Sequence, residues 1–281
     1  MATSNSSSYI FSPSMKTLPI TQQQPNIKHN HKSSFSLPSY CQKIVAELLG
    51  TYILIFTGCG AAMADRDRPL TIIGIAMVWG LCLMALIYTL GHISGAHFNP
   101  AVSIAFAAVG RLRLIYVPMY VVSQLLGSTL ACLTLKVLFN HQPDMLPTLT
   151  RFSTPVTDFE AFLWEFIITF ILMFTINGVA TDDRSSKELA GVAIGVTLLF
   201  NVIIAGPITG ASMNPARSIG PAIVANEYEK LWIFISSPIL GALTATIVYS
   251  LLRQPKQERQ DIESESPKSI IYNNVYSHSI V

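Results

Sequence analysis

The sequence is poor in charged residues. Only 12% of its 281 residues are Asp, Glu, Lys or Arg, whereas these make up about 25% of an ordinary soluble domain. Since 51% of the residues are hydrophobic, the composition favours a multi-span membrane protein over a soluble one. The net charge of +2 gives no reason to expect nucleic acid as a partner.

Several chemical signals are also missing. The four cysteines form no C-x-x-C pair and three of them lie in apolar segments, so we interpret them as small buried residues: Cys41, Cys59, Cys82 and Cys132. No apolar segment carries a nucleophile with a base and an orienting group, and there is no phosphate-binding loop. We therefore expect no enzyme, no cofactor and no bound metal. The first forty residues lack an apolar core, so no signal peptide is predicted.

Long apolar segments dominate the rest of the chain. Six are near the roughly 20 residues that cross a bilayer: about 43–63, 70–90, 115–138, 160–180, 189–207 and 231–252. Two shorter ones, near 99–109 and 214–224, fit re-entrant half-helices surrounded by protein. Residues 1–39 and 253–281 are polar and are predicted to be tails, the first of them disordered.

The apolar part of the chain contains an internal repeat. GHISGAHFNPAVS at 91–103 and GPITGASMNPARS at 206–218 share eight residues at a constant offset of 115. Glu47 and Thr51 in the first span correspond to Glu165 and Thr169 in the fourth. Each repeat, 43–139 and 160–252, holds three spans and one half-helix. Since three is odd, the second repeat has to be inverted in the membrane.

Each copy of the motif predicts a helix start. Asn is a good helix N-cap and Pro suits the first helical turn, so Asn99-Pro100-Ala101 and Asn214-Pro215-Ala216 begin the two half-helices. In an inverted repeat these starts face each other near the membrane centre and bring two positive dipole ends together. Each Asn side chain also offers an N–H₂ donor. The arrangement favours an uncharged hydroxylated solute and repels cations and protons.

These motifs resemble those of the aquaporin, or major intrinsic protein, family over about residues 40–252. The resemblance implies an all-α membrane protein, a right-handed bundle of six transmembrane helices and two re-entrant half-helices, arranged as an inverted repeat. It also implies a homotetramer with one pore in each protomer. Glu47 and Glu165 are costly charges in apolar helices, and the family implies that they accept hydrogen bonds from the backbone of the re-entrant loops.

The resemblance also locates a narrow constriction. Counting from the two motif asparagines assigns it to Trp79, Val202, Ala211 and Arg217. This set is similar to the first subgroup of the plant nodulin-26-like branch, which implies glycerol permeability with modest water flux. Relatives that carry boric or silicic acid have a smaller residue than Trp at the second-span position, so Trp79 argues against those acids.

Other functions stay open at this point. The chain could be mainly a water channel, or a channel for metalloid acids, hydrogen peroxide, ammonia or lactic acid. A proton-coupled transporter would need more ionisable residues in its spans. A membrane-anchored interaction protein would depend on its tails rather than on a pore.

Location and regulation are predicted from charges and serines. A weak excess of Lys and Arg on one side favours cytoplasmic termini, in the plasma membrane or an endomembrane. His92 and His97 flank the first motif and are candidate pH sensors. The C-terminal serines Ser264, Ser266 and Ser269 are candidate sites for a kinase, since a phosphate would add about −1.5 to −2 charge.

Overall fold

The computed structural model describes residues 39–142 and 144–253, and this part of the chain is helical with no β-strand. The six helices long and apolar enough to cross a membrane are α1 (Ser39–Asp67), α2 (Thr71–Ser94), α4 (Tyr116–Leu138), α5 (Asp158–Ile176), α6 (Ala190–Thr209) and α8 (Leu231–Leu252). The two half-helices are α3 (Pro100–Ala108) and α7 (Pro215–Ala225). Three short turns are η1 (Leu146–Thr148), η2 (Asn177–Thr181) and η3 (Lys187–Leu189). The predicted all-α fold, with six spans and two half-length helices, is confirmed.

Some helices extend beyond the predicted spans, whereas α5 ends at residue 176, before its predicted end at about 180. α1 was predicted at about 43–63 but runs from residue 39 to 67, and α2 continues four residues past position 90. Hydropathy marks only the part that lies in hydrocarbon, whereas a helix continues until a residue stops it. For α2 and α6 that residue is a glycine in the left-handed conformation, Gly95 (φ 95°) and Gly210 (φ 82°).

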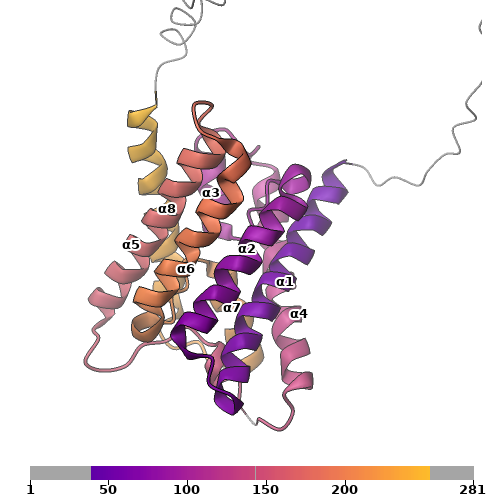
Figure 1. Ribbon diagram of the computed structural model, residues 1–281, viewed down its shortest axis with the longest axis vertical. Helices are drawn as coiled ribbons and strands as arrows, with labels where there is room; N and C mark the ends of the chain where they lie inside the picture. Colours follow the sequence, from indigo (N-terminus) through magenta and orange to yellow (C-terminus); the bar gives the residue numbers. More distant parts are fainter. Residues whose placement is uncertain (1–38, 143, 254–281) are drawn as a thin grey trace, which may run out of the picture. The chain divides into compact units, whose positions relative to one another are not determined.

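The helices pack as pairs that repeat. α1 packs on α4 in the first half and α5 packs on α8 in the second, while α2 and α6 pack on each other across the two halves (Figure 1). A Cβ atom on Gly80 would lie 2.6 Å from the carbonyl oxygen of Gly195, and the reverse distance is also 2.6 Å. The absence of side chains at this crossing lets the two halves approach closely.

The half-helices lie inside this bundle. α3 contacts α4 and α8, α7 contacts the same two helices, and the two half-helices contact each other. Figure 1 shows α3 in the upper half of the bundle and α7 in the lower half. Large apolar side chains cover the outward faces of the spans, for example Ile73, Val122 and Ile247, which are 55–61% exposed. A lipid bilayer is the medium that such faces require.

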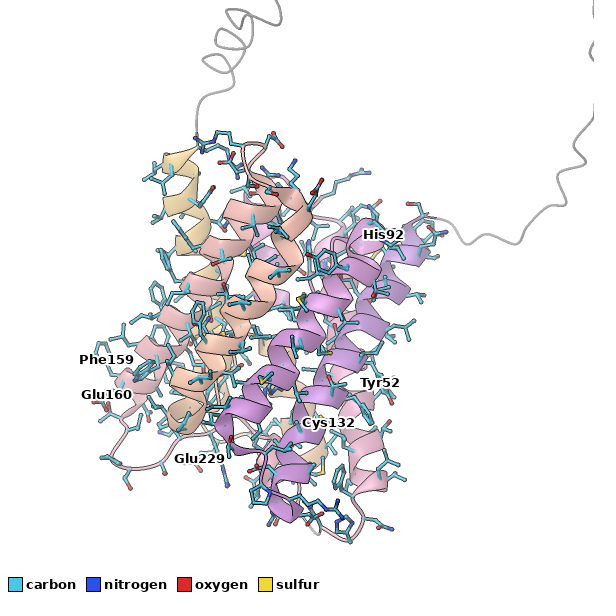
Figure 2. All side chains as sticks on the ribbon, viewed as in Figure 1. Tyr52, His92, Cys132, Phe159, Glu160 and Glu229 are labelled. Atoms are coloured by element: carbon cyan, nitrogen blue, oxygen red, sulfur yellow. The ribbon has the colours of Figure 1, made fainter. Side chains whose placement is uncertain are left out.

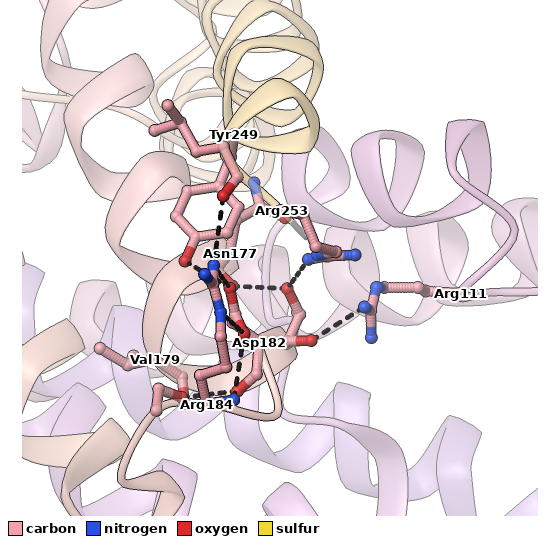
Figure 3. Close-up of polar contacts among 10 residues, drawn as sticks. Arg111, Asn177, Val179, Asp182, Arg184, Tyr249 and Arg253 are labelled. Carbon is pink, nitrogen blue, oxygen red and sulfur yellow. Dashed lines mark hydrogen bonds and ion pairs between the residues drawn. The ribbon is translucent and has the colours of Figure 1, made fainter. Parts of the chain in front are cut away.

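A polar cluster closes the end of α5 (Figure 3). The turn η2 ends at Thr181 and is followed directly by Asp182. Asp182 is buried and accepts hydrogen bonds from Arg184 Nε (3.0 Å) and Nη2 (2.6 Å) and from the Tyr249 hydroxyl (3.1 Å). The hydrogen bond from the Arg184 side chain holds the pKa of the Asp182 carboxyl well below its usual value. The cluster thus joins the turn to α8.

Replacing Asp182 by Asn should destabilise the protein by about 1–3 kcal/mol at pH 7, because charged hydrogen bonds to a buried partner are lost. A pKa depressed in the folded state contributes stability above the unfolded value of about 3.9 and loses it as the pH falls. The difference in thermal midpoint between wild type and Asp182→Asn should therefore shrink below about pH 4. Asp183→Asn is the control, since Asp183 pairs with Lys187 at the exposed surface. An equal loss in both variants would contradict the prediction.

Candidate pore and constriction

Asn99 and Asn214 begin the two half-helices in the same way. The side-chain oxygen of Asn99 accepts a hydrogen bond from the backbone N–H of Ala101 (2.8 Å), and that of Asn214 accepts one from Ala216 (2.9 Å). Pro100 and Pro215 occupy the first helical position, where a missing N–H costs nothing. The local sequence therefore forms a capped helix start in each repeat.

The two helix starts are tied to each other. The Asn99 side-chain amide donates to the backbone oxygen of Met213 (2.8 Å), and the Asn214 amide donates to that of Phe98 (2.8 Å). An amide carries two N–H donors, and no second acceptor is present for either amide among the described residues. One N–H of each asparagine thus has no acceptor among the described residues, and the positive ends of both half-helices meet at the same place.

Glu47 supports the first re-entrant loop. It lies in α1, is fully buried, and accepts hydrogen bonds from the Ser94 hydroxyl (2.6 Å) and the Gln124 amide (2.8 Å). It also accepts from the backbone N–H groups of His97 (3.0 Å) and Phe98 (2.7 Å). A buried carboxylate needs such partners, and these partners hold the loop against α1.

Glu165 makes the equivalent contacts in the second repeat. It is fully buried in α5 and accepts from the Thr209 hydroxyl (2.6 Å) and the backbone N–H groups of Ser212 and Met213 (both 2.9 Å). Phe98 and Met213 take the same left-handed conformation, with φ of 48° and 52°. A non-glycine residue adopts that conformation at a cost, and the N–H bonds to the carboxylates help to hold it.

One internal cavity of about 100 Å³ joins the predicted site residues. Both motif asparagines line it, and so do all four residues assigned to the constriction: Trp79, Val202, Ala211 and Arg217. These four come from α2, α6, the loop before α7 and α7 itself. Much of the remaining wall is aliphatic, including Leu83, Ile194 and Leu198.

Arg217 and Trp79 form the polar and aromatic part of this wall. The guanidinium carbon of Arg217 lies 5.2 Å from the centroid of the Trp79 ring, within range of a cation–π interaction. Arg217 also donates from Nη1 to the backbone oxygen of Thr148. Both side chains are largely buried, 6% exposed for Arg217 and 7% for Trp79, so their positions are defined by packing.

Comparison with known proteins identifies the family of this chain. A family model described as Major intrinsic protein matches residues 34–249. The chain belongs to the major intrinsic protein family. It is 51% identical to Aquaporin NIP1-2 of Arabidopsis thaliana, over 85% of this chain and 83% of that protein. It is 52% identical to Nodulin-26 of Glycine max, over 83% of this chain and 86% of that protein.

A solved structure has the same fold. The aquaglyceroporin from Plasmodium falciparum matches 75% of this chain and 95% of its own length, with a TM-score of 0.69 and 26% identity. The resemblance to the aquaporin family and its nodulin-26-like branch is thus confirmed. This major intrinsic protein is an integral, multi-pass membrane channel rather than an enzyme.

Sequence reasoning missed several residues of this major intrinsic protein that hydrogen-bond to Glu47, Glu165 and Arg217. Ser94 and Thr209 were identifiable, because they occupy equivalent positions of the repeat and each donates to a buried glutamate. Thr148 could not be identified from the sequence, because it lies in η1, between the two repeats, and has no matching position in either of them. Gln124 has no counterpart either, since Pro238 follows the matching serine of the second repeat.

The two candidate pH sensors lie in different surroundings. His97 is half-buried and lines the cavity, with Nδ1 3.1 Å from the Ser103 hydroxyl and its ring 4.9 Å from that of Phe106. His92 is exposed near the end of α2, at the upper end of the bundle in Figure 2. The candidate phosphorylation sites Ser264, Ser266 and Ser269 lie outside the described residues.

Proposed function

We propose that this major intrinsic protein is a passive channel for small uncharged solutes, chiefly glycerol-like polyols, with modest water permeability. The observation that carries the proposal is the single cavity lined by Trp79, Val202, Ala211 and Arg217 together with both motif asparagines. Arg217 and the asparagines supply hydrogen-bond donors for hydroxyl groups. Trp79, Val202 and Ala211 supply apolar surface for a carbon backbone.

Exclusion of ions follows from the same site. Arg217 places a full positive charge in the wall, and the starts of α3 and α7 add the positive ends of two helix dipoles. A cation or proton would lose its hydration where the potential is positive. A neutral solute loses only the hydrogen bonds between its hydroxyl groups and water, and the donors of the wall replace them. We expect no coupling to a proton gradient.

Two substitutions test the assigned constriction. Trp79→Ala should admit bulkier neutral solutes, because it removes the largest side chain of the four. Val202→His should narrow the opening, add a donor and raise the permeability to water relative to glycerol. The measurement is the swelling of proteoliposomes of purified protein with a panel of neutral solutes.

The solute panel also separates the alternatives. It should contain water, glycerol, lactic acid, ammonia, hydrogen peroxide, boric acid and arsenous acid, and a proton-flux assay should run beside it. Water flux without glycerol flux would replace the proposal with a water channel. Glycerol-to-water ratios that stay at the wild-type value in both variants would refute the assigned constriction.

Assembly, location and regulation remain proposals. We infer a homotetramer with one pore in each protomer, as the family resemblance implies. We also infer a channel domain over residues 40–252 and cytoplasmic termini, in the plasma membrane or an endomembrane. Since the number of spans is even, both described ends lie on one side. A kinase acting on Ser264, Ser266 or Ser269 rests on the sequence alone.

A further inference from the structure

The indole ring of Trp79 occupies the space that a side chain at position 58 would need. A Cβ atom built on Gly58 of α1 would lie 2.2 Å from Cε2 of the Trp79 ring and 2.3 Å from Cδ2 and Cζ2. Non-bonded carbon atoms approach to about 3.5–4.0 Å. The indole therefore occupies the space that any side chain at position 58 would need.

The rest of the ring has little room to move. Trp79 is only 7% exposed and packs in the hydrophobic core, with the guanidinium of Arg217 5.2 Å from its centroid. The open space beside the ring is the cavity that it lines with Arg217. A side chain at position 58 would therefore push the indole toward the lumen.

We propose that Gly58 is a specificity-determining position of this channel. Its missing side chain forms a notch in α1 that holds the indole back, so that a residue as large as Trp can stand in the constriction while the passage stays open. Gly58 is a positioning residue, since it acts through Trp79. The inference rests on the proposed function and deepens it, because it names what sets the size of the opening.

A second glycine of the same helix provides a matched control. A Cβ atom on Gly60 would meet only Leu135 Cδ2, at 3.3 Å, which is the end of a flexible side chain. Gly58→Ala and Gly60→Ala make the same chemical change in α1, two residues apart. They share the effect of alanine on the helix and differ in whether Trp79 is touched.

The experiment compares four variants in proteoliposomes: Gly58→Ala, Gly60→Ala, Trp79→Ala and the double variant Gly58→Ala with Trp79→Ala. Gly58→Ala should lower glycerol permeability on the order of tenfold, which corresponds to a barrier higher by about 1.4 kcal/mol, and should lower water permeability less. Gly60→Ala should keep the wild-type glycerol-to-water ratio. The double variant should behave like Trp79→Ala alone, because the three atoms nearest to the added methyl group all belong to the indole that it lacks.

The outcomes distinguish this inference from the proposed function. A wild-type protein that passes no neutral solute would refute the proposed function. If Gly58→Ala keeps the wild-type glycerol-to-water permeability ratio while Trp79→Ala changes it, the inference about Gly58 is overturned and the proposed function stands. Poor folding of Gly58→Ala that Trp79→Ala restores supports the steric coupling between the two positions. A folding defect of Gly58→Ala that persists in the double variant overturns this steric coupling.

Discussion

Glu165→Leu is expected to abolish the folded channel. Leucine removes the acceptors of one hydroxyl and two backbone N–H groups, those of Thr209, Ser212 and Met213, in a site that is fully buried. Each buried donor left unpaired costs about 1–3 kcal/mol. The sum is comparable to the whole stability of a typical domain, about 5–15 kcal/mol.

The measurement is gel filtration of the detergent-extracted protein, followed by solute flux. Glu165→Leu should aggregate or elute as a broad peak. Glu165→Gln keeps one acceptor oxygen, so a larger fraction of this variant should elute as a monodisperse peak. Glu160→Gln is the control, because Glu160 belongs to the same helix but is exposed (Figure 2). It accepts a hydrogen bond from the backbone N–H of Thr157 at the helix start. A monodisperse Glu165→Leu protein with wild-type flux would show that the second loop does not depend on this carboxylate.

Arg217→Ala is expected to raise proton and cation leak through the channel. One unit charge at about 5 Å, with an effective dielectric constant of about 20, raises the energy of a passing cation by about 3 kcal/mol. Its loss corresponds to roughly two orders of magnitude in rate. The dipole ends of α3 and α7 remain, so that the variant should still conduct ions poorly compared with an ion channel.

Proton flux is best followed with a pH-sensitive dye inside liposomes, driven by a potassium gradient and valinomycin. Arg217→Lys should stay tight to protons, because it keeps the positive charge, but should change the solute ratio, because it loses the planar guanidinium. Arg151→Ala is the control, since Arg151 is exposed in the loop before α5. Equal proton flux in Arg217→Ala and Arg151→Ala would show that Arg217 does not contribute to the exclusion of protons.

Much of the fold could be predicted from the chain. The six spans follow from runs of apolar residues, and the two half-helices follow from apolar segments that are too short to cross a bilayer. The repeated Asn-Pro-Ala motif and the matched Glu47 and Glu165 predicted an inverted pair of repeats, because three spans reverse the direction of the chain. Helix ends were predicted less well, since α1 continues past its apolar stretch at both ends.

The geometry of the candidate pore could be predicted in part. The helix starts at Asn99 and Asn214 follow from local capping chemistry, which depends only on neighbouring residues. The contact of each asparagine amide with the opposite loop does not, because Asn99 and Met213 are 114 positions apart in the chain. The same holds for the hydrogen bond from Arg217 to Thr148, since η1 lies outside the repeat.

The sequence by itself determines the spans, the half-helix starts and the inverted relation of the two repeats. The reason is that apolar length, helix capping and an internal repeat depend only on neighbouring or matching positions in the chain. The width of the passage is different. In our proposal, it depends on how Gly58 of α1 packs against Trp79 of α2 and on how Arg217 contacts η1. A few tenths of an ångström decide such contacts, because interiors are close-packed. Only the assembled helices determine those distances.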